Sequence, residues 1–254
     1  ACLLTLGLTP LVRGAALRWG CVDRPSHDRW GRRLIARLGG VALFGGWIGA
    51  VVLTVPINRL VGTLLGGCLF VLVIGIVDDV RRLRPYTKLL WQLAVGCVLV
   101  MAGMRLQLSQ WPWVSIPLWV CWFVLAMNAF NLLDNMDGLA AGVGMIAAVM
   151  CVVHAALVGN WLVATLAAAI AGACLGFLRY NFPPAKIYMG DSGSHLLGLS
   201  LSALSLWISG GATGSTQLLS ILAVPALVLA VPIFDTGFVT FQRLLHRRHP
   251  FRGG

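Results

Sequence analysis

The sequence predicts an all-α membrane protein, a polytopic bundle of helices in the bilayer. Three observations support this fold class: the composition, the long apolar runs, and the distribution of basic residues between them. Of the 254 residues, 59% are hydrophobic and 11% are charged, whereas soluble domains carry roughly 25% charged residues. This composition excludes a soluble enzyme, a disordered tail and a secreted disulfide scaffold.

The apolar runs are long enough to cross a bilayer, because a spanning helix needs about 20 residues. Residues 1–12 are expected to be the end of a further, partial first helix. We expect one membrane-embedded domain over residues 1–254, cut at both ends. Eight full spanning helices are expected, at residues 38–56, 60–77, 89–104, 116–133, 139–158, 161–178, 195–209 and 217–241.

Basic residues mark one side of this bundle. If each run crosses once, all of the 19 Lys and Arg except Arg59 and Arg105 fall in alternate loops. Positively charged loops stay in the cytoplasm, so this side is expected to be cytoplasmic. The net charge of +11 is therefore interpreted as topology, and no nucleic-acid partner is expected.

All eight acidic residues are aspartates, and all fall on that same side. Acids near hydrocarbon are costly, so a cluster at one membrane face indicates a functional site. Asp23 and Asp28 are also explained by the arginines beside them. The other six are Asp78, Asp79, Asp134, Asp137, Asp191 and Asp235.

Asp78 and Asp79 end an apolar run. Adjacent carboxylates repel unless a cation compensates them. Mg²⁺ prefers one or two carboxylates together with substrate phosphates, which suits phosphoryl transfer. The alternative is a helix end followed by a basic turn at Arg81.

A second polar cluster runs from Asn128 to Asp137. On a continuing helix, Asn128, Asn131 and Asp134 share a face, which Asp137 extends. These polar groups are therefore expected to converge at one membrane surface.

A third motif, residues 188–194, contains Tyr188 and Asp191 and is rich in glycine and serine. Small residues at a helix start form a nest of backbone N–H groups that favours phosphate, and Asp191 adds a metal ligand. The alternative is a turn with a serine cap.

These motifs together resemble the polyprenyl-phosphate N-acetylhexosamine-1-phosphate transferase family over nearly the whole chain. Five blocks match in order, at residues 23–40, 75–92, 128–140, 188–194 and 232–251.

The resemblance implies a transferase of the bacterial inner (plasma) membrane, with its active site facing the cytoplasm. It implies transfer of a sugar 1-phosphate from a UDP-N-acetylhexosamine to undecaprenyl or decaprenyl phosphate, with release of UMP. The implied cofactor is Mg²⁺, with Mn²⁺ as a substitute. Membrane lipids are expected partners, and a homodimer is left open.

The resemblance also implies roles for individual residues. Asp191 would be the principal metal ligand, and Asp78 and Asp79 would assist the metal or deprotonate the lipid phosphate. Lys88 would hold a phosphate, and Tyr188 would stack on uracil. The nucleotide site would be lined by Asn128, Asn131, Asp134 and Asp137.

The short run from Asp79 to Lys88 favours the GlcNAc-1-phosphate type, which starts O-antigen, teichoic acid or capsule synthesis, over the phospho-MurNAc-pentapeptide type. A transporter with buried acids is the alternative from another class. The family's His-rich loop would follow residue 251, so the chain as given is expected to lack activity by itself.

Overall fold

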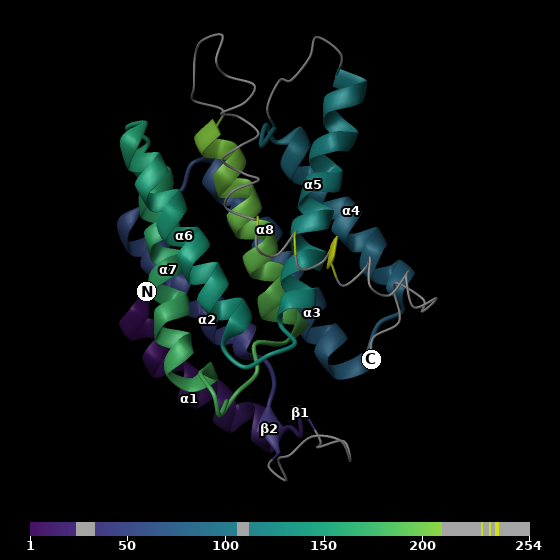
Figure 1. Ribbon diagram of the computed structural model, residues 1–254, viewed down its shortest axis with the longest axis vertical. Coiled ribbons are helices and arrows are strands. Elements are labelled where there is room, and N and C mark those ends of the chain that lie inside the picture. The colour runs from purple at the N-terminus through teal and green to yellow at the C-terminus, as the bar shows by residue number, and fades with distance from the viewer. Residues whose placement is uncertain (24–33, 106–111, 210–229, 231–233, 235–236, 239–254) are drawn as a thin grey trace.

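The computed structural model describes residues 1–23, 34–105 and 112–209, together with residues 230, 234, 237 and 238. These ranges are almost entirely helical, as expected, and the departure is one short antiparallel strand pair (Figure 1). The helices are α1 (Cys2–Arg18), α2 (Gly39–Thr54), α3 (Arg59–Arg81), α4 (Pro85–Met101), α5 (Pro112–Leu133), α6 (Leu139–Leu157), α7 (Trp161–Asn181) and α8 (Gly190–Ser209), and the strands are β1 (Val22–Asp23) and β2 (Ile35–Ala36).

Four of the described helices, α3, α5, α6 and α7, are long and apolar enough to cross a membrane. The chain is therefore a multi-pass membrane protein. Helices α2 and α4 are apolar but have 16 and 17 residues, which span about 25 Å at about 1.5 Å per residue, less than a hydrocarbon core of about 30 Å. The expected count of eight full spanning helices is not supported by the described residues. The last expected helix, 217–241, lies outside them apart from four residues.

Helix α8 is the central element of the bundle. It packs against α2, α3, α5, α6 and α7, and Figure 1 shows it between α6 and α5. Three of its serines, Ser200, Ser202 and Ser205, are buried and donate to backbone carbonyls of the preceding turn. This internal bonding satisfies their hydroxyls, so a helix with a polar sequence can lie inside an apolar bundle.

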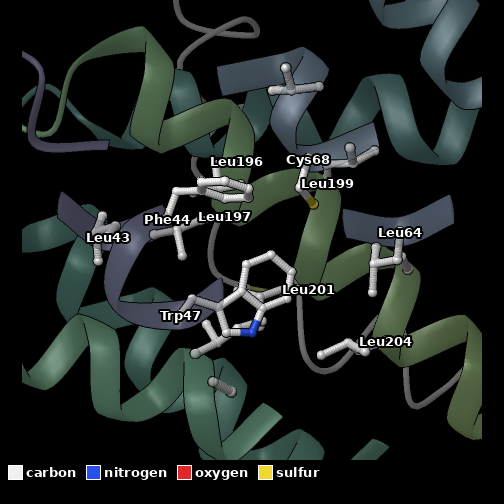
Figure 2. Close-up of a cluster of buried hydrophobic side chains, with 14 of the residues drawn as sticks. Leu43, Phe44, Trp47, Leu64, Cys68, Leu196, Leu197, Leu199, Leu201 and Leu204 are labelled. Carbon is white, nitrogen blue, oxygen red and sulfur yellow. The ribbon is translucent and has the colours of Figure 1, made fainter. Parts of the chain in front are cut away.

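Part of the hydrophobic core lies where α2 and α3 pack against α8. Figure 2 shows Trp47 of α2 among leucines of α8, with Leu64 and Cys68 of α3 nearby. The indole Nε1 of Trp47 donates to the carbonyl of Leu166 in α7 at 3.2 Å. This bond satisfies the polar atom of a large buried side chain.

Glycines let the backbones of α2 and α3 touch the start of α8. A Cβ on Gly40 would lie 2.3 Å from the main-chain nitrogen of Gly193, and one on Gly75 would lie 2.4 Å from Cα of Ser192. No side chain fits at such distances. The first turn of α8 is thereby held against the end of α3 that carries Asp78 and Asp79.

The segment before α8 is tied to the segment before α2. The main-chain N–H of Tyr188 donates to the carbonyl of Ala36, and Gly39 N–H donates back to the carbonyl of Tyr188. Ala36 also pairs with Val22, where β2 meets β1. The loops that precede α2 and α8 therefore form one connected layer at this end of the bundle.

Candidate active site

Six of the expected site residues come from the ends of four helices that meet at one end of the bundle. Asp78 and Asp79 lie in the last turn of α3, and Lys88 lies in the first turn of α4. The end of α5 supplies Asn131, and Asp134 follows directly after it, while Asp191 lies in the first turn of α8. Because the helices alternate in direction, these ends all lie at the same face.

The Lys88 ammonium lies between two carboxylates. Its Nζ is 2.6 Å from Oδ2 of Asp191 and also forms an ion pair with Oδ2 of Asp78. The other oxygen of Asp78 accepts a hydrogen bond from Leu83 N–H at 2.7 Å. The buried Asp78 carboxylate is thus compensated on both oxygens, which is the condition for keeping a charge inside a protein.

Asp79 caps the N-terminus of α8. Its two oxygens accept the main-chain N–H groups of Asp191 at 2.9 Å and Ser192 at 3.2 Å. Gly190, with φ +75°, approaches this carboxylate so closely that a Cβ would lie 2.6 Å from Oδ2. The N–H groups that the sequence indicated for a phosphate are therefore bound by a carboxylate of the protein itself.

The second oxygen of Asp191 is held by Asn131. Asn131 Nδ2 donates to Oδ1 of Asp191 at 2.8 Å and to the hydroxyl of Ser194 at 3.2 Å. Lys88 and Asn131 thus hold the Asp191 carboxylate from two sides.

Asn128 makes its hydrogen bonds elsewhere. Its Nδ2 donates to Oε1 of Gln92 in α4 at 2.8 Å and to the carbonyl of Val124 at 2.8 Å. Gln92 is buried. The pair therefore links α4 to α5 below the carboxylates. Contact of Asn128 with a nucleotide stays a prediction.

The helix expected to continue through Asp137 ends at Leu133. Asp137 therefore does not extend the face of Asn131. Its Oδ2 instead accepts Ala185 N–H at 2.9 Å, in the loop after α7. Gly138, the residue before α6, has φ +73° and donates its N–H to Oδ1 of the buried Asn181 at 3.1 Å, so polar bonds and a glycine turn replace the last helical turn.

Asp134 lies just outside α5 in a strongly negative environment. Burial, reinforced by the charges of Asp191 and Asp79, raises the pKa of Asp134 well above its ordinary value. A hydrogen bond from the main chain of Gly190 and the charge of Arg37 act in the opposite direction. Asp134 thus belongs to the same electrostatic group as the carboxylates of α3 and α8.

Tyr188 is half-buried and lies three residues before Asp191. Its main chain holds the layer formed with Ala36 and Gly39. The position places it at the edge of the carboxylate group, and stacking on a base stays a prediction.

Sequence patterns alone did not single out His195. This side chain is fully buried, and its Nδ1 lies 2.7 Å from the main-chain carbonyl of Asp191. The signal that was available is spacing, because residues four apart lie on one face of a helix.

The donor set fits a hard divalent ion. Among the described residues, no three His, Cys, Asp or Glu side chains form a preassembled metal site. Mg²⁺ does not require one, since it is held by one or two carboxylates with substrate phosphates. Asp78 and Asp191 already converge on one cationic group, the Lys88 ammonium.

Comparison with known proteins identifies the family. The family model described as glycosyl transferase family 4 matches residues 61–209, which run from the first turn of α3 to the end of α8 and include the carboxylate group. The chain belongs to this family of membrane transferases.

Two relatives are similar over almost the whole chain, and a third over about two thirds of it. A probable undecaprenyl-phosphate N-acetylglucosaminyl 1-phosphate transferase of Bacillus subtilis is 37% identical over 97% of this chain and 70% of its own length. A decaprenyl-phosphate N-acetylglucosaminephosphotransferase of Mycolicibacterium smegmatis is 34% identical over 98% of this chain and 70% of its own length. A phospho-N-acetylmuramoyl-pentapeptide-transferase of Limosilactobacillus fermentum is 36% identical over only 65% of this chain and 56% of its own.

Proposed function

We propose that the protein transfers N-acetylglucosamine 1-phosphate from UDP-N-acetylglucosamine to a polyprenyl phosphate and releases UMP, at the cytoplasmic face of the plasma membrane. The observation that carries the proposal is the convergence of Asp78 and Asp191 on Lys88 at one end of a membrane bundle. A charged nucleotide arrives from water and a lipid phosphate lies at the bilayer surface. Both substrates can therefore reach a group at the helix ends.

Asp191 and Asp78 would hold Mg²⁺, or Mn²⁺ in its place. The ion would neutralise the diphosphate and the charge that develops on the leaving UMP. Asp79 is engaged as the cap of α8 through both of its oxygens, so we assign it to placing Asp191. Asn131 keeps the Asp191 carboxylate aimed through its bond to Oδ1.

In the proposed step, an oxygen of the polyprenyl phosphate attacks the β-phosphorus of the donor. The bond from this phosphorus to the bridging oxygen breaks, and UMP leaves with the electron pair. A phosphate monoester has a second pKa of about 6, so the acceptor is mostly a dianion at neutral pH and can attack without losing a proton. Lys88 would hold a phosphate oxygen during the transfer.

The choice of GlcNAc over the MurNAc-pentapeptide rests on the connection between α3 and α4 and on the relatives. Only residues 82–84 join the two helices, which leaves little chain to contact a peptide. The two GlcNAc-type relatives also match nearly all of this chain, whereas the MurNAc-pentapeptide relative matches about two thirds of it.

The test is an assay of UMP release with a full-length version of the protein in lipid nanodiscs, polyprenyl phosphate as acceptor, and radiolabelled UDP-GlcNAc or UDP-MurNAc-pentapeptide as donor. We expect release from UDP-GlcNAc that depends on Mg²⁺ and on the acceptor, and little from the peptide donor. Faster release from UDP-MurNAc-pentapeptide would support the peptidoglycan alternative. Absence of release from both donors, with uptake of a solute into vesicles, would support a transporter.

A further inference from the structure

His195 is a buried polar side chain directly beneath the carboxylate group. It lies one helical turn after Asp191 in α8, and its Nδ1 is 2.7 Å from the carbonyl oxygen of Asp191. A carbonyl can only accept, so Nδ1 carries the proton and donates it. The same bond to a carbonyl four residues earlier is made by Asn128 toward Val124.

This bond completes a set of contacts that holds Asp191 by every polar atom. Its N–H is bound by Asp79, and its two carboxylate oxygens are bound by Lys88 and Asn131. Its carbonyl is bound by His195, with the hydroxyl of Ser194 a longer contact at 3.5 Å. The side-chain direction of Asp191 is thus set partly through its main chain.

The imidazole itself has little freedom. It is fully buried, and its ring packs edge-to-face on the indole of Trp91, with 5.1 Å between the ring centroids. Trp91 belongs to α4, one turn after Lys88. His195 is therefore braced by the helix that also supplies the ammonium of the ion pair.

We propose that His195 is a positioning residue for ion binding: it fixes the main chain of Asp191 so that the carboxylate meets a divalent cation without rearranging. The inference rests on the proposed function, in which Asp191 is a metal ligand. His195 contacts no substrate in this arrangement, because it lies on the inner side of Asp191. Its effect should appear in the affinity for the ion.

The test compares three variants by Mn²⁺ titration, followed by electron paramagnetic resonance of the free ion, in nanodiscs without substrate. His195→Leu keeps the bulk and removes the donor, and His195→Asn keeps a donor that can make the bond seen at Asn128. Ser200→Ala is the matched control, because it removes a buried bond to a carbonyl on the same helix. The half-saturating Mg²⁺ for UMP release is a second readout.

We expect His195→Leu to weaken Mn²⁺ binding about fivefold, the effect of losing one hydrogen bond of about 1 kcal/mol. His195→Asn should bind within about twofold of the wild type, and Ser200→Ala should be unchanged. If His195→Leu does not fold, His195→Met replaces it as the variant without a donor.

Two outcomes would overturn the inference. Wild-type affinity in the donor-less variant, or equal loss in His195→Asn, would show that the hydrogen bond does not position Asp191. Failure of the proposed function looks different. In that case the wild type and Asp191→Asn would bind Mn²⁺ equally weakly, and Asp191 would be no metal ligand for His195 to position.

Discussion

Asp191 combines a negative charge with a fixed orientation, because Lys88 and Asn131 hold its two oxygens. Asp191→Asn keeps the shape and the acceptor for Asn131 but loses the charge that attracts a divalent ion. We expect UMP release to fall by at least about 10²-fold, with a nearly unchanged melting temperature. Near-native rates at low Mg²⁺ would show that Asp191 is not a ligand.

Asp79 is expected to contribute more than Asp191 to the stability of the fold. Asp79→Ala leaves two N–H groups at the start of α8 without acceptors, and loss of a cap costs about 0.5–2 kcal/mol. Thermal unfolding in nanodiscs should therefore shift downward. The control is Asp23→Ala, which removes a partly exposed pair with Arg37 worth about 0–1 kcal/mol. Equal shifts for both variants would contradict the capping role.

The ionisation of Asp134 makes the stability of the folded protein depend on pH, and the direction of this dependence can be predicted. Since its pKa is raised in the folded protein, the folded state favours the protonated form, and stability is lost as pH rises from the ordinary value of about 3.9 through the raised pKa. Asp134→Asn cannot ionise. In EDTA, we expect its stability relative to the wild type to increase between pH 5 and pH 8. A constant difference over that range would rule out the raised pKa.

At the scale of elements, the contact of α3 with α8 requires a glycine at position 75, because glycine has no side chain. Gly75→Ala would place a Cβ 2.4 Å from the backbone of Ser192, and such overpacking costs about 1–3 kcal/mol. We expect lower stability together with lost activity, because Asp79 would move away from the N–H groups at the start of α8 that it binds. Gly66→Ala in the same helix meets nothing within 4 Å and serves as the control. It should retain both stability and UMP release.

Much of the element order was predictable from the sequence, because long apolar runs interrupted by polar loops have few alternatives. The expected runs 139–158 and 161–178 match α6 and α7 closely. The turn after a helix was harder to predict: the run 116–133 ends where α5 ends, but the turn at Gly138 and the bond of Asp137 to the loop after α7 were not expected. Those partners lie far along the chain, so no local pattern specifies them.

The candidate site was predictable as a set of residues but not as a set of contacts. The grouping of Asp78 and Asp191 follows from acids at one membrane face, and the family resemblance implied Lys88 beside them; the structure brings the three together. The capping of α8 by Asp79 and the pairing of Asn128 with Gln92 depend on how helices cross. Such contacts arise from tertiary packing, and single-sequence patterns carry little information about them.

For the whole molecule, the distribution of charge predicts that the carboxylate end faces the cytoplasm. Met136→Cys lies at this end and Ile57→Cys at the other, and both side chains are exposed. In right-side-out cells, an impermeant maleimide should label Ile57→Cys and leave Met136→Cys unlabelled. The unsubstituted protein, with its own seven cysteines, gives the background. The reverse pattern would place the site outside and exclude a cytosolic nucleotide donor.

The contact of Lys88 with Asp191 has a consequence for the proposed uptake of an ion. Lys88 Nζ lies on the Oδ2 oxygen that a divalent cation would use, so loading would be an exchange in which one positive group replaces another. The Asp191 carboxylate would be compensated before and after this exchange. The displaced ammonium would become available to the diphosphate of the proposed donor, so ion uptake and substrate capture would be linked by a single side-chain movement.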